Sequence, residues 1–466
     1  MASISVRYYP FIRLATALWL SLLLVEQAIA QPSSGWGTDS LYHMATGIRG
    51  AASCAAAGCH GGPKPGVSSV HLARGSEYSL WLEVDPHANS WKTMSSAKSV
   101  SILSKLNILR DGTILDGAAY QNCLACHNTD RVVPADRHSP RIAEGVGCES
   151  CHGPSEPWYD RHYQGPSSKT NAIANLGLTD SEPLVPRAKL CATCHVGGKD
   201  RDMNHEIIAA GHPTLYFDMA VYHEAYPKHW REHKSSETNF RSQLWLAGKI
   251  AMADSELELI ASRANKSLSV STWPELSNYQ CNRCHVSLQG IPLPNRNSNE
   301  DTLKGRAPVR NWNLAGLELL PQSKNGCSTE LAEANSEIRR EMQAATPDAI
   351  LVGELAQKLR IRLFELVAFD GKPTLPDWSK QKQIRISLQL LEKSRIDNSW
   401  ESASEAYVSL WATKTAHSSE PLGHAMKTIR NGLLFPKDML STTLPSERWD
   451  EALRLAVIAL QSEACK

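Results

Sequence analysis

The pattern of apolar and polar positions separates the chain into a turn-rich part and a helical part. Between residues 31 and 290, Gly, Pro and short polar turns interrupt the pattern, except over 240–265, where apolar residues recur with helical spacing. After Thr329 helical spacing dominates, without the alternation typical of strands. The segments with this spacing are 328–343, 349–367, 386–395, 403–416 and 449–464.

These patterns predict a mainly α protein whose first part has sparse regular structure. We expect a first domain over residues 31–290 and a helical C-terminal domain over 328–466. Residues 291–327 contain several Pro, Gly and Asn residues, and we expect them to form a linker or a long wrapping loop.

Residues 1–30 have the pattern of an export signal. Arg7 and Arg13 precede an apolar stretch over 14–25, and residues 28–30 (Ala-Ile-Ala) resemble a cleavage site. The apolar stretch of about 12 residues is short against the roughly 20 that span a membrane, so we favour cleavage after Ala30 over an uncleaved anchor. We therefore expect a soluble protein in the periplasm, or otherwise exported, with no membrane span after cleavage.

The composition excludes several classes of protein. The 466 residues carry a formal charge of +1, which gives no reason to expect a nucleic-acid partner. Apolar residues make up 42% and charged residues 21%, so the chain is neither disordered nor a multi-span membrane protein. The unusual counts are 12 Cys and 17 His.

Ten of the 12 Cys form five pairs, each followed directly by His. The motifs are Cys54/Cys59/His60, Cys123/Cys126/His127, Cys148/Cys151/His152, Cys191/Cys194/His195 and Cys281/Cys284/His285. Four have the spacing C-x-x-C-H and the first has C-x4-C-H. This spacing suits haem c, because two thiols bond the two vinyl groups of one porphyrin while the His binds its iron. We expect about five covalently bound haem c groups, or four if the first motif is empty or forms a disulfide.

Zinc sites and disulfides are the competing interpretations of the Cys pairs. Zinc does not require a His directly after each second Cys, and five disulfides leave the five His unexplained. The two remaining cysteines, Cys327 and Cys465, flank the C-terminal region. We expect them to form a disulfide in an oxidising compartment, with a redox-active or metal-binding pair as the alternative.

The other axial position of each iron is open to ten further histidines between residues 31 and 290. From local context we favour His87, together with His205 and His212, whose spacing of seven places them on one side of a helix. His162 lies near Trp158 and Tyr163, which could pack on a porphyrin. We expect three histidines near Trp230 to lie at the surface or to bind propionates: His223, His229 and His233. We leave His43 and His71 open, and any Met ligand is less favoured than core packing.

The order of the motifs resembles that of exported multihaem cytochromes related to the cytochrome c-554 family, within the group that includes hydroxylamine oxidoreductase. The similarity rests on C-x4-C-H followed by Gly-Gly, W-x4-PHA at 81–88, and the segments NCLACH, GVGCESCHGP, LCATCHVG and NHEIIAAGHP. It covers residues 50–215 well and reaches the fifth motif loosely. It implies a mainly α domain of closely packed, mostly bis-His haems that pass electrons. It also implies His162 as a distal ligand, and His205 or His212 as another, and it allows one iron without a sixth ligand.

We therefore expect an electron carrier between redox protein partners, either a membrane quinol-linked donor or a periplasmic acceptor. The propionates of five haems would make the holoprotein acidic, which favours a basic partner surface. The alternative is an oxidoreductase in which one open haem acts on a small nitrogen or sulfur compound, although the chain has no C-x-x-C-K motif. The C-terminal helices, which we expect to bind no haem, would cap the haem array or dock a partner.

Overall fold

A computed structural model of the chain describes most residues from Gly47 onward. The described residues are 47–63, 75–131, 143–230, 232, 237–267, 272–285, 307–320, 328–369, 373–375, 378–397, 400–413, 420–433, 451, 454, 455, 457 and 458. Within them the fold is mainly α, as predicted, with two short antiparallel strand pairs. No helix in these ranges combines the length and the apolar character that crossing a membrane requires.

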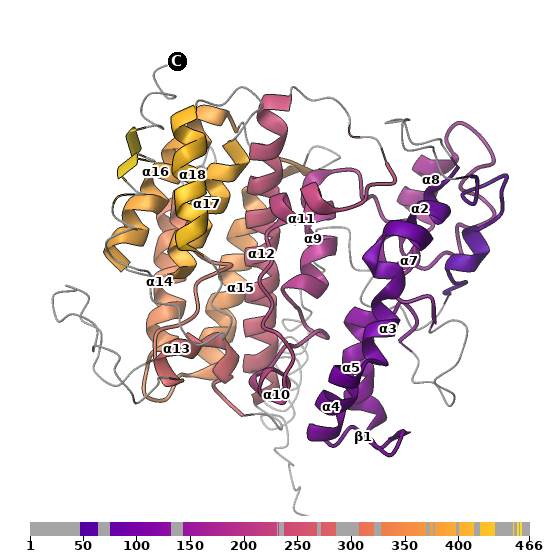
Figure 1. The fold of residues 1–466 in the computed structure, drawn as a ribbon, viewed down its shortest axis with the longest axis horizontal. Helices are drawn as coiled ribbons and strands as arrows, with labels where there is room; N and C mark the ends of the chain where they lie inside the picture. Colours follow the sequence, from indigo (N-terminus) through magenta and orange to yellow (C-terminus); the bar gives the residue numbers. More distant parts are fainter. Residues whose placement is uncertain are drawn as a thin grey trace, which may run out of the picture.

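The first elements form a narrow column, drawn in indigo and purple in Figure 1. They are η2 (Ala51–Cys54), α2 (Glu77–Val84), η3 (Pro86–Asn89), α3 (Ser90–Met94), α4 (Ala97–Lys105), β1 (Leu109–Arg110), β2 (Thr113–Ile114), α5 (Gly117–His127), α7 (Glu149–His152) and α8 (Ser168–Asn175). β1 pairs with β2 in antiparallel register, Leu109 opposite Ile114. A small core around Trp91, Leu103 and Tyr120 holds α3, α4 and α5 together.

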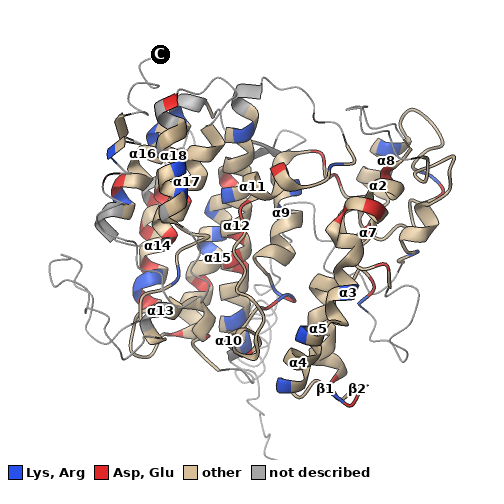
Figure 2. Ribbon diagram, in the orientation of Figure 1, with Lys and Arg blue, Asp and Glu red and all other residues tan. Residues whose placement is uncertain are grey.

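A bundle of longer helices stands beside this column (Figure 1). Its elements are α9 (Leu184–His195), α10 (His205–Ala210), α11 (Met219–Ala225), α12 (Glu237–Ser267), η4 (Leu276–Asn278), α13 (Cys281–Cys284), η5 (Leu317–Leu319), α14 (Ser328–Met342), α15 (Ala349–Glu365), β3 (Ala368–Phe369), β4 (Pro373–Thr374), α16 (Lys380–Asp397), α17 (Trp400–Thr413) and α18 (Glu420–Gly432). Acidic and basic residues are intermingled along these helices (Figure 2), consistent with the nearly neutral formal charge.

Helix α12 is the centre of the bundle. It packs on α9 and α15 and also contacts α11, α16 and α17. Apolar side chains on most of its sides are buried in one core that extends from Val185 to Leu433. Ion pairs reinforce the packing: Lys189 of α9 reaches Asp254 of α12, and Lys249 of α12 reaches Glu405 of α17 at 3.1 Å. This single core therefore crosses the boundary that the sequence predicts near residue 290.

The helices predicted from apolar spacing over 240–265, 328–343, 349–367, 386–395 and 403–416 are confirmed as α12 and α14–α17. Before residue 290 the regular structure consists mostly of short helices, which follow one another through the column, and α12 is the long one there. The sequence pattern did not predict α18 or the strand pair β3–β4. The predicted signal, the Cys327–Cys465 disulfide and most of the helix over 449–464 lie outside the described residues.

Candidate haem sites

Each motif histidine faces a second histidine from a distant part of the chain. The distances between the ring centroids lie between 6.1 and 6.5 Å. We number the sites by motif: site 1 is His60 with His162 at 6.2 Å, site 2 is His127 with His212 at 6.3 Å, site 3 is His152 with His229 at 6.5 Å, site 4 is His195 with His87 at 6.1 Å, and site 5 is His285 with His205 at 6.1 Å.

These separations fit a metal ion held between two imidazoles. Two metal–imidazole bonds of about 2 Å, with about 1 Å from each bonding nitrogen to its ring centre, place opposed centroids about 6 Å apart. The donor set at each site is two thiols, one adjacent His and one opposed His, which is the set that a bis-His haem c requires. Among the described residues, no three or more His, Cys, Asp or Glu side chains gather at a common point as the ligands of another metal ion would.

Helix ends position three of the motifs. α5, α7 and α9 each finish on the motif His. In α5 and α9 both cysteines lie in the last turns as well, whereas in the single turn α7 the first cysteine, Cys148, is the N-cap residue. Asp116 begins α5 by accepting a hydrogen bond from the backbone N–H of Ala119 at 3.0 Å. In site 5 the single turn α13 ends at Cys284, one residue before His285. Site 1 differs, because η2 ends at its first cysteine, Cys54.

The second cysteine of site 1, Cys59, is exposed, as are Cys151 of site 3 and Cys284 of site 5. Its wider spacing has a local cause: the chain leaves η2 at Cys54 and forms a turn, in which the backbone N–H of Cys59 donates to the carbonyl of Ala56 at 2.8 Å. Both cysteines of this motif are described and free, so they do not form the disulfide that was the alternative. Haem attachment stays a prediction at this motif, as at the other four.

The distal histidines also lie at element boundaries. His87 is in η3, whose cap Asp85 accepts from the backbone N–H of His87 at 2.9 Å. His205 is the first residue of α10, and His212 follows two residues after that helix ends. Asn204 caps α10 by accepting from the backbone N–H of Ile207 at 3.0 Å. The short helix α10 and the two residues after it therefore supply ligand candidates for two sites, 2 and 5.

Hydrogen bonds to Nδ1 orient four of the ten rings. The ring nitrogens of His162 and His212 lie 2.8 Å from the backbone carbonyls of Tyr159 and Pro213. Those of His60 and His87 contact carboxylates instead, Glu77 at 3.0 Å and Asp85 at 2.9 Å. An Nδ1–H that donates to such a partner leaves Nε2 free to bind a metal, and a carboxylate partner also raises the basicity of the ring.

Burial keeps four of the ten rings neutral. It lowers the pKa of His152 to about 4, and it also lowers the pKa of His127, His195 and His229. Hydrogen bonds to carboxylates have the opposite effect: Glu77 raises the pKa of His60, and Asp85 raises the pKa of His87 against its burial. Metal binding requires the neutral imidazole, so the motif histidines of sites 2 to 4 and His229 are suited to a metal at ordinary pH.

The carboxylate groups beside His60 and His87 remain ionised. Burial opposes ionisation of Asp85, but hydrogen bonds from His87 and Tyr226 and the charge of His87 outweigh it and lower the pKa of the carboxyl group. The Tyr226 hydroxyl donates to the second carboxylate oxygen at 2.5 Å. The pKa of Glu77 is also lowered, since its contacts with His60 and two backbone amides outweigh its burial.

Contacts between cysteines indicate which sites are neighbours. The thiols of Cys54 in site 1 and Cys148 in site 3 shift each other's pKa, lowering the first and raising the second. The thiols of Cys194 in site 4 and Cys126 in site 2 do the same. Burial, with the nearby thiols of site 4, raises the pKa of Cys151 in site 3 to about 12. The thiol contacts thus give the order 1, 3, 4, 2, and α10 joins site 2 to site 5.

The four distal candidates named from the sequence, His87, His162, His205 and His212, each face a motif histidine. His229 was expected at the surface or on a propionate, and instead it faces His152, with its ring against Trp230 at 5.2 Å. The number of histidines could have indicated this role for His229, because five motif histidines need five partners and local context had supplied only four.

Of the other histidines named from the sequence, one contacts a carboxylate and faces no motif histidine, and three lie outside the described residues. His223 is buried, and its Nε2 lies 2.9 Å from Glu232, which also pairs with Arg187. His43, His71 and His233 lie outside the described residues.

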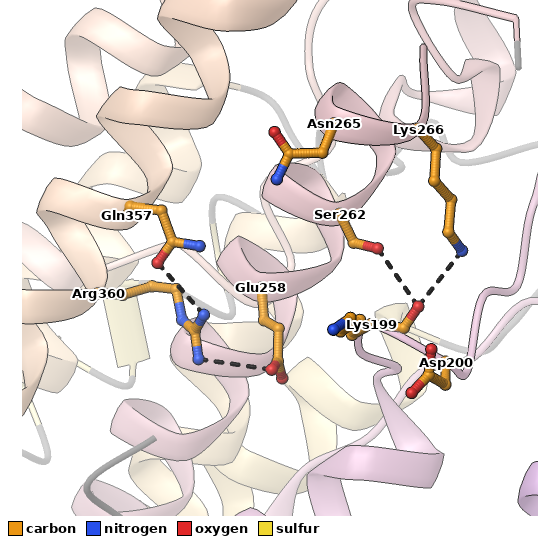
Figure 3. Close-up of a pocket in the computed structure, with 8 residues that line it drawn as sticks. All are labelled: Lys199, Asp200, Glu258, Ser262, Asn265, Lys266, Gln357 and Arg360. Carbon is orange, nitrogen blue, oxygen red and sulfur yellow. Dashed lines mark hydrogen bonds and ion pairs between the residues drawn. The ribbon is translucent and has the colours of Figure 1, made fainter. Parts of the chain in front are cut away.

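A cavity of about 250 Å³ lies away from these pairs, between α12 and α15 (Figure 3). Its lining is polar, and its charged groups contact their own neighbours: Arg360 pairs with Glu258 at 3.6 Å, and Lys266 donates to the backbone carbonyl of Lys199 at 3.3 Å. None of the motif or distal histidines lines it.

The comparisons with known proteins bear on the first three motifs. Residues 52–153 match the family model described as cytochrome c554 and c-prime. No curated protein and no solved structure was found to match the chain. The matched segment contains the Cys-His motifs of sites 1, 2 and 3 and the distal candidate His87. Over this segment, the chain is similar to the family of cytochrome c554 and c-prime.

Proposed function

We propose that the protein is an exported pentahaem cytochrome that transfers electrons through five bis-His haem c groups. The observation that carries the proposal is the set of five histidine pairs, in which each motif histidine is opposed at 6.1–6.5 Å by a second histidine. Haem c supplies one-electron Fe(III)/Fe(II) chemistry when bound. Two cysteines would attach each group and the two opposed histidines would bind its iron, and burial keeps the motif rings of sites 2 to 4 neutral.

The proposed ligands fall into two kinds. The motif cysteines and histidines attach each haem, and His87, His162, His205, His212 and His229 supply the distal ligands. Because the described cysteine contacts follow the order 1, 3, 4, 2, with α10 leading to site 5, electrons would pass between sites in that order. His60 is 42% exposed, and Cys59, Cys284 and His285 are exposed, so sites 1 and 5 are the candidate points of entry and exit.

The proposal includes the partners and the compartment. The signal pattern over residues 1–30 supports export to the periplasm, and a quinol-linked membrane donor or a periplasmic acceptor fits a carrier there. The alternative is an oxidoreductase with one open iron. We favour the carrier, because every motif histidine among the described residues has a histidine opposite it.

The test is a haem count per chain combined with low-temperature EPR of the oxidised holoprotein and carbon monoxide addition to the reduced one. We expect five low-spin haems and no carbon monoxide shift. The ring planes are nearly parallel at sites 1 and 5 (14° and 19°) and steeply inclined at the others (63° to 80°), so two kinds of low-spin signal are expected. A high-spin signal that binds carbon monoxide in the unmodified protein would instead support the oxidoreductase.

A further inference from the structure

We propose that Asp85 is a positioning residue that lowers the redox potential of the site 4 haem through its hydrogen bond to His87. The inference rests on the proposed function, since it requires His87 to be an axial ligand. It assigns a role in electron transfer to a side chain that belongs to none of the five Cys-His motifs.

The geometry around Asp85 is fully specified. The Asp85 side chain is 2% exposed. Its Oδ1 accepts from both the backbone N–H and the Nδ1–H of His87, each at 2.9 Å, and its Oδ2 accepts from the hydroxyl of Tyr226. The backbone hydrogen bond makes Asp85 the cap of η3, so the element that presents His87 also fixes the carboxylate against it.

The consequence for the iron follows from the basicity of the ring. A carboxylate that accepts from Nδ1–H gives the imidazole partial anionic character, and a more basic axial ligand favours Fe(III) over Fe(II). The effect grows with burial, because water does not screen the charge. His60 of site 1 has the comparable contact with Glu77, but Glu77 is 28% exposed. Nδ1 of His162 and Nδ1 of His212 each lie against a neutral backbone carbonyl in place of a carboxylate. We therefore expect Asp85 to exert the largest such effect.

Tyr226 provides a test with the opposite sign. Its hydroxyl draws charge from the carboxylate, and this weakens the pull of Asp85 on the proton of His87. Its ring is held independently, 5.8 Å from His87 and stacked on Trp230 at 5.5 Å. Removing only the hydroxyl should therefore strengthen the Asp85–His87 hydrogen bond without moving the ring.

The experiment is a potentiometric titration of the purified holoproteins, followed by optical spectra and EPR. Asp85→Asn should raise the potential of one haem, with about a tenfold change in its reduced-to-oxidised ratio at fixed ambient potential, which corresponds to about 59 mV. Tyr226→Phe should lower the potential of the same haem. Asp116→Asn, which replaces an exposed helix cap that contacts no ligand histidine, is the matched control and should shift none. His87→Met identifies the haem, because it introduces a thioether ligand there.

The outcomes separate this inference from the function on which it rests. If His87→Met leaves all haem spectra unchanged, His87 is not a ligand and the proposed site 4 is wrong. If His87→Met alters one haem but Asp85→Asn leaves its potential in place, or Tyr226→Phe raises it or leaves it unchanged, Asp85 has only a structural role. If Asp85→Asn does not accumulate as holoprotein, the direction in which Tyr226→Phe shifts the haem potential tests the role of Asp85 by itself.

Discussion

Asp218 is expected to make the stability of the protein fall as the pH rises. Its carboxylate caps α11, where it accepts from the backbone N–H of Val221 at 2.9 Å, and it is buried. Burial, aided by the charge of Glu405 and opposed by Lys249, raises its pKa from 3.8 to about 7. The helix that it caps lies beside site 4, because Phe217 stacks on His195 at 5.1 Å.

The magnitude and its sign follow from the two pKa values. The folded protein holds the proton on Asp218 between about pH 4 and pH 7, whereas the unfolded chain releases it. The contribution to stability is therefore fully present below about pH 4 and is lost as the pH rises through about 7. About three pH units at about 1.36 kcal/mol each give a loss of up to about 4 kcal/mol.

Asp218→Asn should remove this loss, because the amide resembles the protonated acid and its oxygen still caps α11. The assay is urea unfolding of the holoprotein, followed by circular dichroism from pH 4 to pH 8. We expect the variant and the parent to agree near pH 4 and the variant to be more stable near pH 8. The exposed cap variant Asp116→Asn is the control. A parent protein whose stability is constant over this range, or a variant less stable than the parent at pH 8, would refute the reasoning.

Three further predictions concern single sites. His229→Gly should open the iron held by His152, giving one high-spin, carbon-monoxide-binding haem per chain, and unchanged EPR would remove His229 from the ligands. Lys189→Met should cost about 3–5 kcal/mol in unfolding free energy, because Asp254 and Glu258 then share a single cation, Arg360; a cost below about 1 kcal/mol would contradict this. Replacing Cys284 together with its motif partner by Ala should lower the pyridine haemochrome count by one, and loss of several haems would show that site 5 supports the others.

The sequence identifies the Cys-His motif of each candidate site more readily than the opposed distal histidine. The motif residues are neighbours in the chain, so covalent spacing alone identifies them. The opposed histidines come from segments 77 (His152 and His229) to 108 (His87 and His195) residues away, and no local pattern carries that information. His229 shows the difficulty, since a polar segment beside Trp230 has the composition of a surface loop.

For the fold, the sequence predicted single helices better than it predicted how they pack together. The 3.6-residue period revealed α12 and α14–α17, because each has enough apolar positions to define its own axis. The period did not reveal that α12 is covered by α9 as well as by α15 and α17, and so it placed a domain boundary where the structure has a continuous core. Partners in tertiary structure decide such boundaries, and they are not encoded within one helix.

The long separation within each histidine pair has a consequence for how the chain is held. If every pair binds one iron, each site closes a loop of 77 to 108 residues, and each loop overlaps at least one other, as 60–162 overlaps 87–195 and 205–285 overlaps 127–212. A cross-link over a loop of this length is worth about 4–5 kcal/mol in lost freedom of the unfolded chain. The five irons would then act as overlapping cross-links. Releasing a ligand in the middle of this region, such as His152, would still leave its segment enclosed by neighbouring loops, whereas His60 and His285 at the two ends have no such second loop.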